Sequence, residues 1–186
     1  QEIATKLNIP VYLYEEAAKI PGRKALPDIR KGQYEGLKTE ISKPERRPDY
    51  GPAQMHPTAG ATVVGARQFL IAYNINLDTS DVGIAKKIAN CIREAKGGYK
   101  YVRAMGVTVQ VGDRDIAQVT INMVNYQGTP LFRVFETVKS EAARYGVNVI
   151  GSEIIGLSPM QALLDVAEFY LRLDGFDRKQ VLEDNL

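Results

Sequence analysis

A segment of strictly alternating side chains constrains the fold of this chain more than any other feature. Residues 69–77, FLIAYNINL, repeat a bulky apolar side chain at every second position. Successive side chains of a β-strand point to opposite faces, so the segment predicts a strand with one strongly apolar face. The pattern becomes regular from Ala61, and one continuous strand over 61–77 is therefore expected. Its apolar face comprises Phe69, Ile71, Tyr73, Ile75 and Leu77.

The elements that follow this strand define a fold class. Residues 80–96 have the apolar spacing of a helix, with Cys91 on the expected buried stripe. Residues 107–123 predict a hairpin around a Gly-Asp turn, 129–145 a second helix, and 147–157 a last strand. The order strand, helix, strand, strand, helix, strand predicts a ferredoxin-like βαββαβ antiparallel sheet with both helices on one face, in the α/β (α+β) class.

The first fifty residues predict a separate unit. They combine the end of a helix, a short apolar strand at Val11–Tyr14 and a helix that begins near Pro27. This pattern is typical of the tail of a second α/β subdomain. The proline-rich residues 42–52 then predict a stiff connector. We therefore expect the tail of one subdomain at 1–50, a connector loop at 51–60 and a second subdomain at 61–186.

One face of the predicted sheet is polar and carries no charge. Solvent-exposed faces usually include Lys and Glu, whereas amides and hydroxyls suit a face that another layer or a polar ligand partly covers. The pattern favours a groove over a plain solvated face. The residues assigned to this face are Asn74, Asn76, Thr108, Gln110, Gln118, Thr120 and Asn122.

Composition excludes several classes of function. The 186 residues carry a net charge of +2 with both signs interspersed, which gives no basic surface for nucleic acid. No apolar run reaches the roughly 18 residues of a membrane span. The single cysteine, Cys91, cannot form an internal disulfide, which fits a reducing cytoplasm. The sequence begins at Gln1 without Met, which suggests a piece of a longer protein.

Four segments together resemble the formiminotransferase family, which includes glutamate formimidoyltransferase and the transferase part of formimidoyltransferase-cyclodeaminase. The resemblance covers essentially the whole chain in order. The segments are PVYLYEEAA, RKALPDIRKGQYEGL, PDYGPAQMHPTAGATVVGARQFLIAYNINL and GSEIIGLSPMQALLDVAEFYL. It implies a folate-dependent transferase of histidine degradation that moves a formimino group between N-formimino-L-glutamate and tetrahydrofolate. The family has two α/β subdomains whose sheets face each other across the folate site.

The family's folate-binding segment matches the connector loop. Glycines would let the backbone approach a flat ring, and prolines would reduce the entropy lost on binding. The alternative is a stiff interdomain linker without a ligand. The resemblance assigns folate contact to Gly51, Pro52, Ala53, Gln54, Met55, His56, Pro57, Thr58, Ala59 and Gly60.

The resemblance assigns no catalytic residue to this chain. The family's catalytic histidine has a Glu-His-Pro context in the first subdomain, and His56 follows Met55 instead. The chain is therefore expected to lack the catalytic half, with the missing N-terminal subdomain as a partner and homodimer formation left open. Tetrahydrofolate is the expected carrier, and no spacing of His, Cys and carboxylates suggests a metal.

Two further side chains and one further function remain open. Arg67 either binds a carboxylate of the substrate or forms a surface ion pair, and Glu153 is interpreted mainly as a turn-capping carboxylate. The alternative function is a non-catalytic ligand-binding or regulatory module, because a ferredoxin-like fold hosts many functions. The stiff 51–60 segment argues against this alternative, since such a module does not require it.

Overall fold

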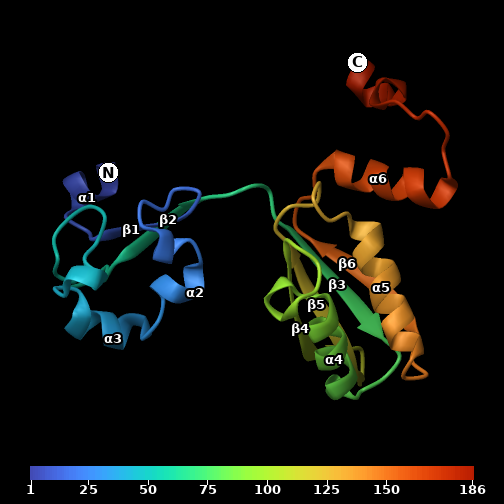
Figure 1. Ribbon diagram of the computed structural model, residues 1–186, viewed down its shortest axis with the longest axis horizontal. Helices are drawn as coiled ribbons and strands as arrows, with labels where there is room; N and C mark the ends of the chain where they lie inside the picture. Colours follow the sequence, from blue (N-terminus) through green and yellow to red (C-terminus); the bar gives the residue numbers. More distant parts are fainter. The chain divides into compact units, whose positions relative to one another are not determined.

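A computed structural model describes residues 1–186 and divides them into two compact units, Gln1–Arg67 and Gln68–Leu186 (Figure 1). The division falls after Arg67, whereas the sequence placed the start of the second subdomain at 61. The predicted connector loop 51–60 thus lies inside the first unit. None of the helices combines the length and the apolar composition that crossing a membrane requires.

The later boundary arises because residues 61–77 form two strands instead of one. Strand β2 (Thr62–Ala66) pairs in parallel with β1 (Val11–Glu15), from Val11 opposite Thr62 to Glu15 opposite Ala66. Strand β3 (Ile71–Leu77) belongs to the other sheet. The prediction of one continuous strand is therefore wrong, and Phe69 between the two strands is 80% exposed. Alternation persists through the segment, but its two halves pair with different partners.

The first unit is built from short elements around β1. Its helices are α1 (Glu2–Leu7), α2 (Leu26–Ile29) and α3 (Gln33–Glu40), with single 3₁₀ turns at Pro21–Arg23 and Pro44–Arg46. The helix predicted from Pro27 is interrupted at Gly32, whose φ of 80° is left-handed. The small core of this unit includes Val11, Tyr12, Ile29 and Ile41.

A buried ion pair ties the proline-rich segment to β1. Nη1 of Arg23 donates to Oδ2 of Asp49 at 2.9 Å, and Nη2 donates to the carbonyl of Arg47 at 2.6 Å. The same Asp49 oxygen accepts from the backbone N–H of Leu13 at 2.8 Å. Only 9% and 3% of the two charged side chains are exposed. Each charge therefore depends on the other for its compensation.

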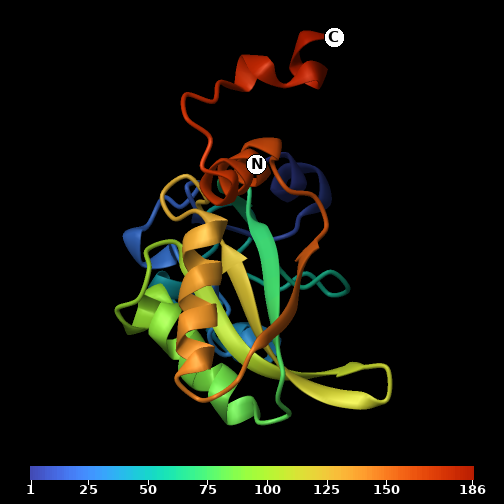
Figure 2. The same cartoon turned by 90° about the vertical axis from the view of Figure 1, so that its right-hand side faces the viewer.

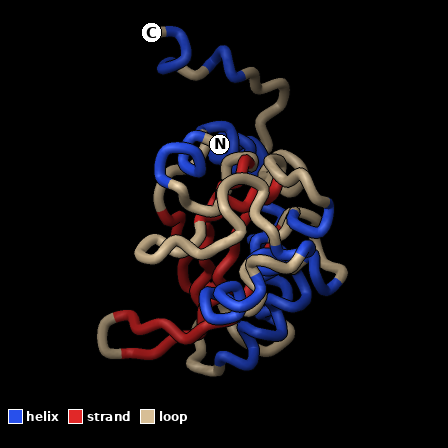
Figure 3. Tube along the Cα trace, turned by 90° about the vertical axis from the view of Figure 1, so that its left-hand side faces the viewer, coloured by secondary structure: helices blue, strands red, loops and turns tan.

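The second unit confirms the ferredoxin-like fold. Its strands are β3, β4 (Val102–Val111), β5 (Arg114–Met123) and β6 (Val149–Ile155), in the order β4-β5-β3-β6 with every pair antiparallel. Helices α4 (Val82–Ile92) and α5 (Leu131–Ala143) cover one face of this sheet (Figure 2). The far end of the β4–β5 hairpin projects beyond the sheet (Figure 3).

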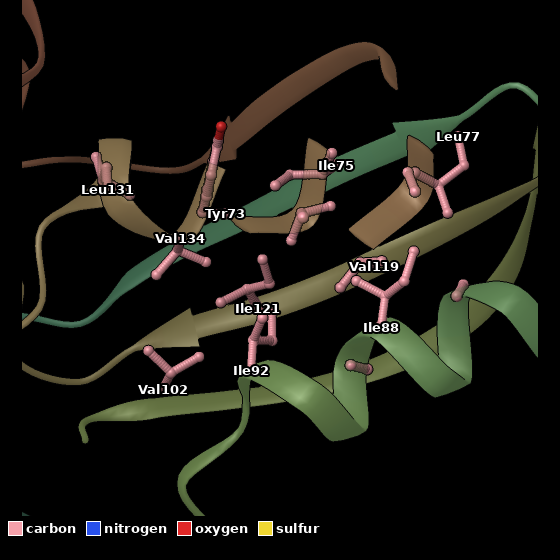
Figure 4. Packing of buried hydrophobic residues seen from close by; sticks show 14 of the residues in the cluster. Tyr73, Ile75, Leu77, Ile88, Ile92, Val102, Val119, Ile121, Leu131 and Val134 are labelled. Carbon is pink, nitrogen blue, oxygen red and sulfur yellow. The ribbon is translucent and has the colours of Figure 1, made fainter. Parts of the chain in front are cut away.

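The alternation of β3 builds the core of the second unit, as predicted. Ile71, Ile75 and Leu77 are fully buried and Tyr73 is 8% exposed. Figure 4 shows these side chains on the same side of the sheet as Ile88 and Ile92 of α4 and Val134 of α5. Burial raises the pKa of Tyr73, and a hydrogen bond from Ser152 opposes part of this rise.

The buried stripe of α4 differs from its prediction at one position. Ala85, Ile88, Ala89 and Ile92 are buried, whereas Cys91 is exposed. Residues three and four positions apart lie on the same face of a helix, so these four residues form one buried face. Cys91 lies next to this face and not on it, because Ala89 occupies the buried position instead.

The second unit ends with α6 (Met160–Leu171) and two 3₁₀ turns at Arg178–Gln180 and Leu182–Asn185. Helix α6 packs on α5 through the stacked rings of Phe132 and Phe169, whose centroids are 4.1 Å apart. Between these helices and strands β3 and β6 lies a largely apolar cavity of about 440 Å³. The edge strand β6 also has a bulge, where its register against β3 shifts between Asn76 and Leu77.

We expect Gly106→Ala to destabilise the second unit. A Cβ at Gly106 would lie 2.3 Å from the backbone nitrogen of Lys86, so α4 would have to move away from β4. Overpacking of this kind costs about 1–3 kcal/mol. Urea unfolding should show this loss, whereas the matched change Gly151→Ala should stay within about 1 kcal/mol because its Cβ meets nothing within 4 Å. Equal stabilities for the two variants would contradict the close helix–strand contact.

Removal of the buried cation in the first unit should also be costly. Arg23→Met leaves the Asp49 carboxylate buried without its partner, and breaking such a pair costs about 3–5 kcal/mol. Lys43→Met removes the cation of the exposed Lys43–Glu40 pair and should cost less than about 1 kcal/mol. Chemical denaturation of both variants provides the comparison, and a similar small loss in both would show that the buried pair is not needed.

Candidate functional site

The segment predicted to bind folate forms a closed turn. The backbone N–H of His56 donates to the carbonyl of Gly60 at 2.9 Å, and the N–H of Gly60 donates back at 3.0 Å. The exposed residues Pro57, Thr58 and Ala59 form the tip of this turn. Two reciprocal hydrogen bonds at its base hold that tip in one conformation.

The only histidine of the chain supports this turn from inside. Nδ1 of His56 accepts from the backbone N–H of Ala59 at 3.0 Å and from that of Thr58 at 3.3 Å. A ring nitrogen that accepts a hydrogen bond carries no proton, so the proton of the neutral ring is on Nε2. The lone pair that a general base needs is therefore directed into the turn.

Two glycines of the loop have clear structural reasons. Gly51 has a φ of 87°, and a Cβ there would lie 2.8 Å from the carbonyl oxygen of Ile9. Gly60 has a φ of 66° and is buried, with a hypothetical Cβ near the ring of Tyr34. The left-handed backbone alone accounts for glycine at both positions, whether or not a ligand binds.

Several other side chains of the loop are available to a ligand. Ala53 and Gln54 are exposed, and Gln54 makes no hydrogen bond within the chain. Pro52 and Met55 are half-buried, and Met55 lines a cavity of about 310 Å³ beside Tyr12, Tyr34 and Val63. Arg67 directly follows β2 and is exposed without an ion pair. The loop thus combines a fixed backbone with unused polar groups.

The second unit contains a polar network that the sequence did not predict. Glu153 lies in the middle of β6 opposite Asn74 of β3, and Asn74 pairs with Thr120 of β5 on its other side. Oε1 of Glu153 accepts from Nδ2 of Asn74 at 3.2 Å and from Nε2 of Gln118 at 3.1 Å. Gln118 also donates to Oδ1 of Asn76 at 2.8 Å. Side chains from β3 and β5 thus converge on the carboxylate of Glu153 in β6.

The interpretation of Glu153 as a turn-capping residue is therefore wrong. Its strand continues to Ile155, and its side chain bonds across the sheet instead of to a turn. The predicted absence of charge from this face is also wrong, since Glu153 lies on it. The sequence does contain a signal for this position, because the two-residue alternation of a strand puts Glu153 on the same face as Gly151 and Ile155. The alternation alone does not show which strands lie beside Glu153.

Two residues assigned to this face lie on the opposite one. Val107 is opposite Gln118, so Thr108, opposite Ala117, and Gln110, opposite Asp115, point the other way. The prediction of Thr108 and Gln110 on the polar face was therefore wrong, because a shift of one residue in register exchanges the two faces of a strand. The placement of Asn74, Asn76, Gln118, Thr120 and Asn122 together is confirmed by the pairing of β3 and β5.

No three His, Cys, Asp or Glu side chains lie close enough together to hold a metal ion. The polar groups of the candidate sites are instead amides, one carboxylate, one guanidinium and backbone N–H groups. These groups recognise planar polar molecules through hydrogen bonds.

Comparison with known families accounts for both units. Residues 1–67 match the N-terminal subdomain of the formiminotransferase domain, and residues 72–185 match the formiminotransferase domain itself. The chain belongs to the formiminotransferase family. The predicted resemblance is thus confirmed, and the matched segments meet at the boundary between the two structural units.

Individual relatives of this formiminotransferase-family chain cover most or all of its length. Glutamate formimidoyltransferase of Streptococcus pyogenes serotype M1 is 54% identical over 187 residues, which is 100% of this chain and 62% of the relative. Its counterpart in Thermoplasma acidophilum is 48% identical over 98% of this chain and 60% of the relative. Mouse formimidoyltransferase-cyclodeaminase is 43% identical over 91% of the chain and 32% of the relative. The chain therefore spans less than two thirds of the length of these relatives.

We expect His56 to be required for the conformation of the loop. His56→Ala removes the acceptor for two backbone N–H groups, and each such bond contributes about 0.5–1.5 kcal/mol. Hydrogen exchange at Thr58 and Ala59 should accelerate about two- to tenfold. His56→Asn should restore part of the protection because an Asn side chain accepts the same type of bond. Unchanged exchange at both amides in His56→Ala would contradict the supporting role.

Proposed function

We propose that this chain belongs to a transferase that moves a formimino group between N-formimino-L-glutamate and tetrahydrofolate, a step of histidine degradation. The observation that carries the proposal is the 54% identity, over the whole chain, to a relative named for glutamate formimidoyltransferase activity. The structure supports it with two sets of unused polar groups, one in each unit.

In this proposal the 51–60 loop contacts folate. A pterin is flat and has an edge of N–H donors and a carbonyl acceptor, which suits the side chain of Gln54 and the fixed backbone of the 56–60 turn. The two hydrogen bonds between His56 and Gly60 hold the backbone before any ligand arrives. Less conformational entropy is then lost on binding.

Arg67 is the proposed carboxylate anchor. Both substrates carry glutamate carboxylates, and the planar guanidinium donates two parallel hydrogen bonds to such a group. The side chain of Arg67 is exposed and has no ion-pair partner, so binding a carboxylate breaks no existing interaction.

The reaction requires positioning and proton transfer. A nitrogen of tetrahydrofolate attacks the formimino carbon, a tetrahedral centre forms, and the bond from that carbon to the glutamate nitrogen breaks. The proton lost by the folate nitrogen is balanced by the proton gained by the leaving glutamate nitrogen. General acid–base help of this kind contributes roughly 10²–10⁴-fold. We assign the proton carrier to a group other than His56, because Nδ1 of His56 is bonded to the loop backbone.

The test is titration of 5-formyltetrahydrofolate into the chain and into two glutamine variants. Gln54→Leu should weaken binding about two- to tenfold, the range expected for one neutral hydrogen bond. Gln127→Leu is the matched control, because Gln127 is also exposed but lies in the second unit outside the loop. Isothermal calorimetry gives both affinities, and thermal unfolding verifies that the variants are folded.

Equal affinities for the wild type and Gln54→Leu would remove Gln54 from the site. Absence of folate binding by the wild-type chain would count against the proposed role of its loop. An assay of formimino transfer with the catalytic half present adds a test of His56: transfer that is lost in His56→Ala but kept in His56→Asn would identify the loop as structurally essential. Loss in both variants would make His56 the base and overturn the assignment.

A further inference from the structure

The carboxylate of Glu153 controls the direction of every hydrogen bond in the polar network. An ionised carboxylate can only accept, so Asn74 and Gln118 must present their NH₂ groups to it. Gln118 is only 5% exposed, and its second N–H is used by Oδ1 of Asn76. This arrangement turns the amide nitrogen of Asn76 away from Gln118. The carboxylate of Glu153 therefore fixes which group donates and which accepts in every hydrogen bond of the network.

This network uses only one of the two carboxylate oxygens. Both donors, Asn74 and Gln118, bond to Oε1. Glu153 has no ion-pair partner, and its side chain is exposed. A stabilising role within the sheet needs no charge, because a glutamine at this position could accept the same two bonds through its carbonyl oxygen. The remaining acceptor, Oε2, and the negative charge are left for a partner outside the network.

We propose that Glu153 binds the planar N–C–N edge of a substrate. This inference rests on the proposed function and adds the residue that recognises the substrate's nitrogen edge. A planar edge of two N–H donors on one carbon can donate from one nitrogen to the free Oε2, and the negative charge of the carboxylate attracts the edge as a whole. A carboxylate fixed by two amides from neighbouring strands holds this geometry before the ligand binds, and the loss of entropy is small.

Both proposed substrates contain such an edge. The formimino group of N-formimino-L-glutamate is an amidine, with two nitrogens on one carbon and a positive charge when protonated. The pterin of tetrahydrofolate has an amino group and a ring N–H on one carbon. The shared chemistry is the same paired donor, and binding experiments on both substrates distinguish the two sources.

The experiment compares Glu153→Gln with Glu168→Gln. In the first variant the amide carbonyl can keep the bonds from Asn74 and Gln118, while the NH₂ group places a donor where the second acceptor was. The second variant removes the same charge from an exposed residue of α6 in the same unit. Both should unfold at the wild-type temperature. Glu153→Asp keeps the charge but withdraws it by one methylene, and serves as a further variant.

Four probes distinguish binding of the amidine from binding of the pterin. N-formimino-L-glutamate is compared with L-glutamate, which lacks the amidine, and 5-formyltetrahydrofolate with p-aminobenzoyl-L-glutamate, which lacks the pterin. Binding is followed by NMR of the ¹³C-labelled glutamate carboxyl groups in the chain, which also detects weak complexes. For the probe whose edge contacts Glu153, we expect Glu153→Gln to weaken binding at least about tenfold, the effect of a charged hydrogen bond.

Weaker binding of the formimino probe alone identifies the amidine as the ligand, and weaker binding of the folate probe alone identifies the pterin. The truncated probes should bind equally to the wild type and Glu153→Gln, and Glu168→Gln should match the wild type throughout. Unchanged affinity of Glu153→Gln for both complete probes overturns the inference, as does a wild type whose Glu153 signal responds to neither. Unchanged binding of both complete probes to Glu153→Gln, together with weaker folate binding in Gln54→Leu, would refute this inference and leave the proposed function standing.

Discussion

The two-residue repeat of β3 is the constraint on which the second unit depends. This strand is hydrogen-bonded on both sides, to β5 and to β6. Its side chains therefore determine which face of the central sheet is apolar and which is polar. Ile71, Ile75 and Leu77 are fully buried against the helices. Asn74 and Asn76 are consequently directed to the opposite face, where no helix covers them. The hydrophobic core and the polar network are two results of one alternation.

The sequence was sufficient to predict this alternation, the order of elements and the ferredoxin-like fold, because each depends on local patterns. It was insufficient where the pairing of distant strands decides the outcome. β2 continues the pattern of β3, yet its partner is β1, more than forty residues earlier in the chain, and no local signal indicates this change of sheet. Thr108 and Gln110 were misplaced for the same reason, since the register of a hairpin is fixed by pairing across it.

The candidate site shows the same limit at the level of single residues. The composition of the 51–60 loop indicated stiffness, but the cause of that stiffness, the acceptor role of His56 within its own turn, required coordinates. Glu153 was visible as a carboxylate between glycines. Its importance follows from Gln118 and Asn74, which come from two other strands and reach it only in the folded sheet. The buried pair of Arg23 and Asp49 was likewise invisible, because its two charges are 26 residues apart.

The position of Glu153 has a second consequence, which concerns the behaviour of the sheet in a crowded solution. β6 is an edge strand, and an edge strand offers free backbone N–H and C=O groups to any other chain that can extend against it. A charged side chain in the middle of the edge and a bulge near its beginning both make it a poor template for such an addition. Selection for a carboxylate that orders three amides would therefore also protect this sheet from intermolecular strand pairing and aggregation.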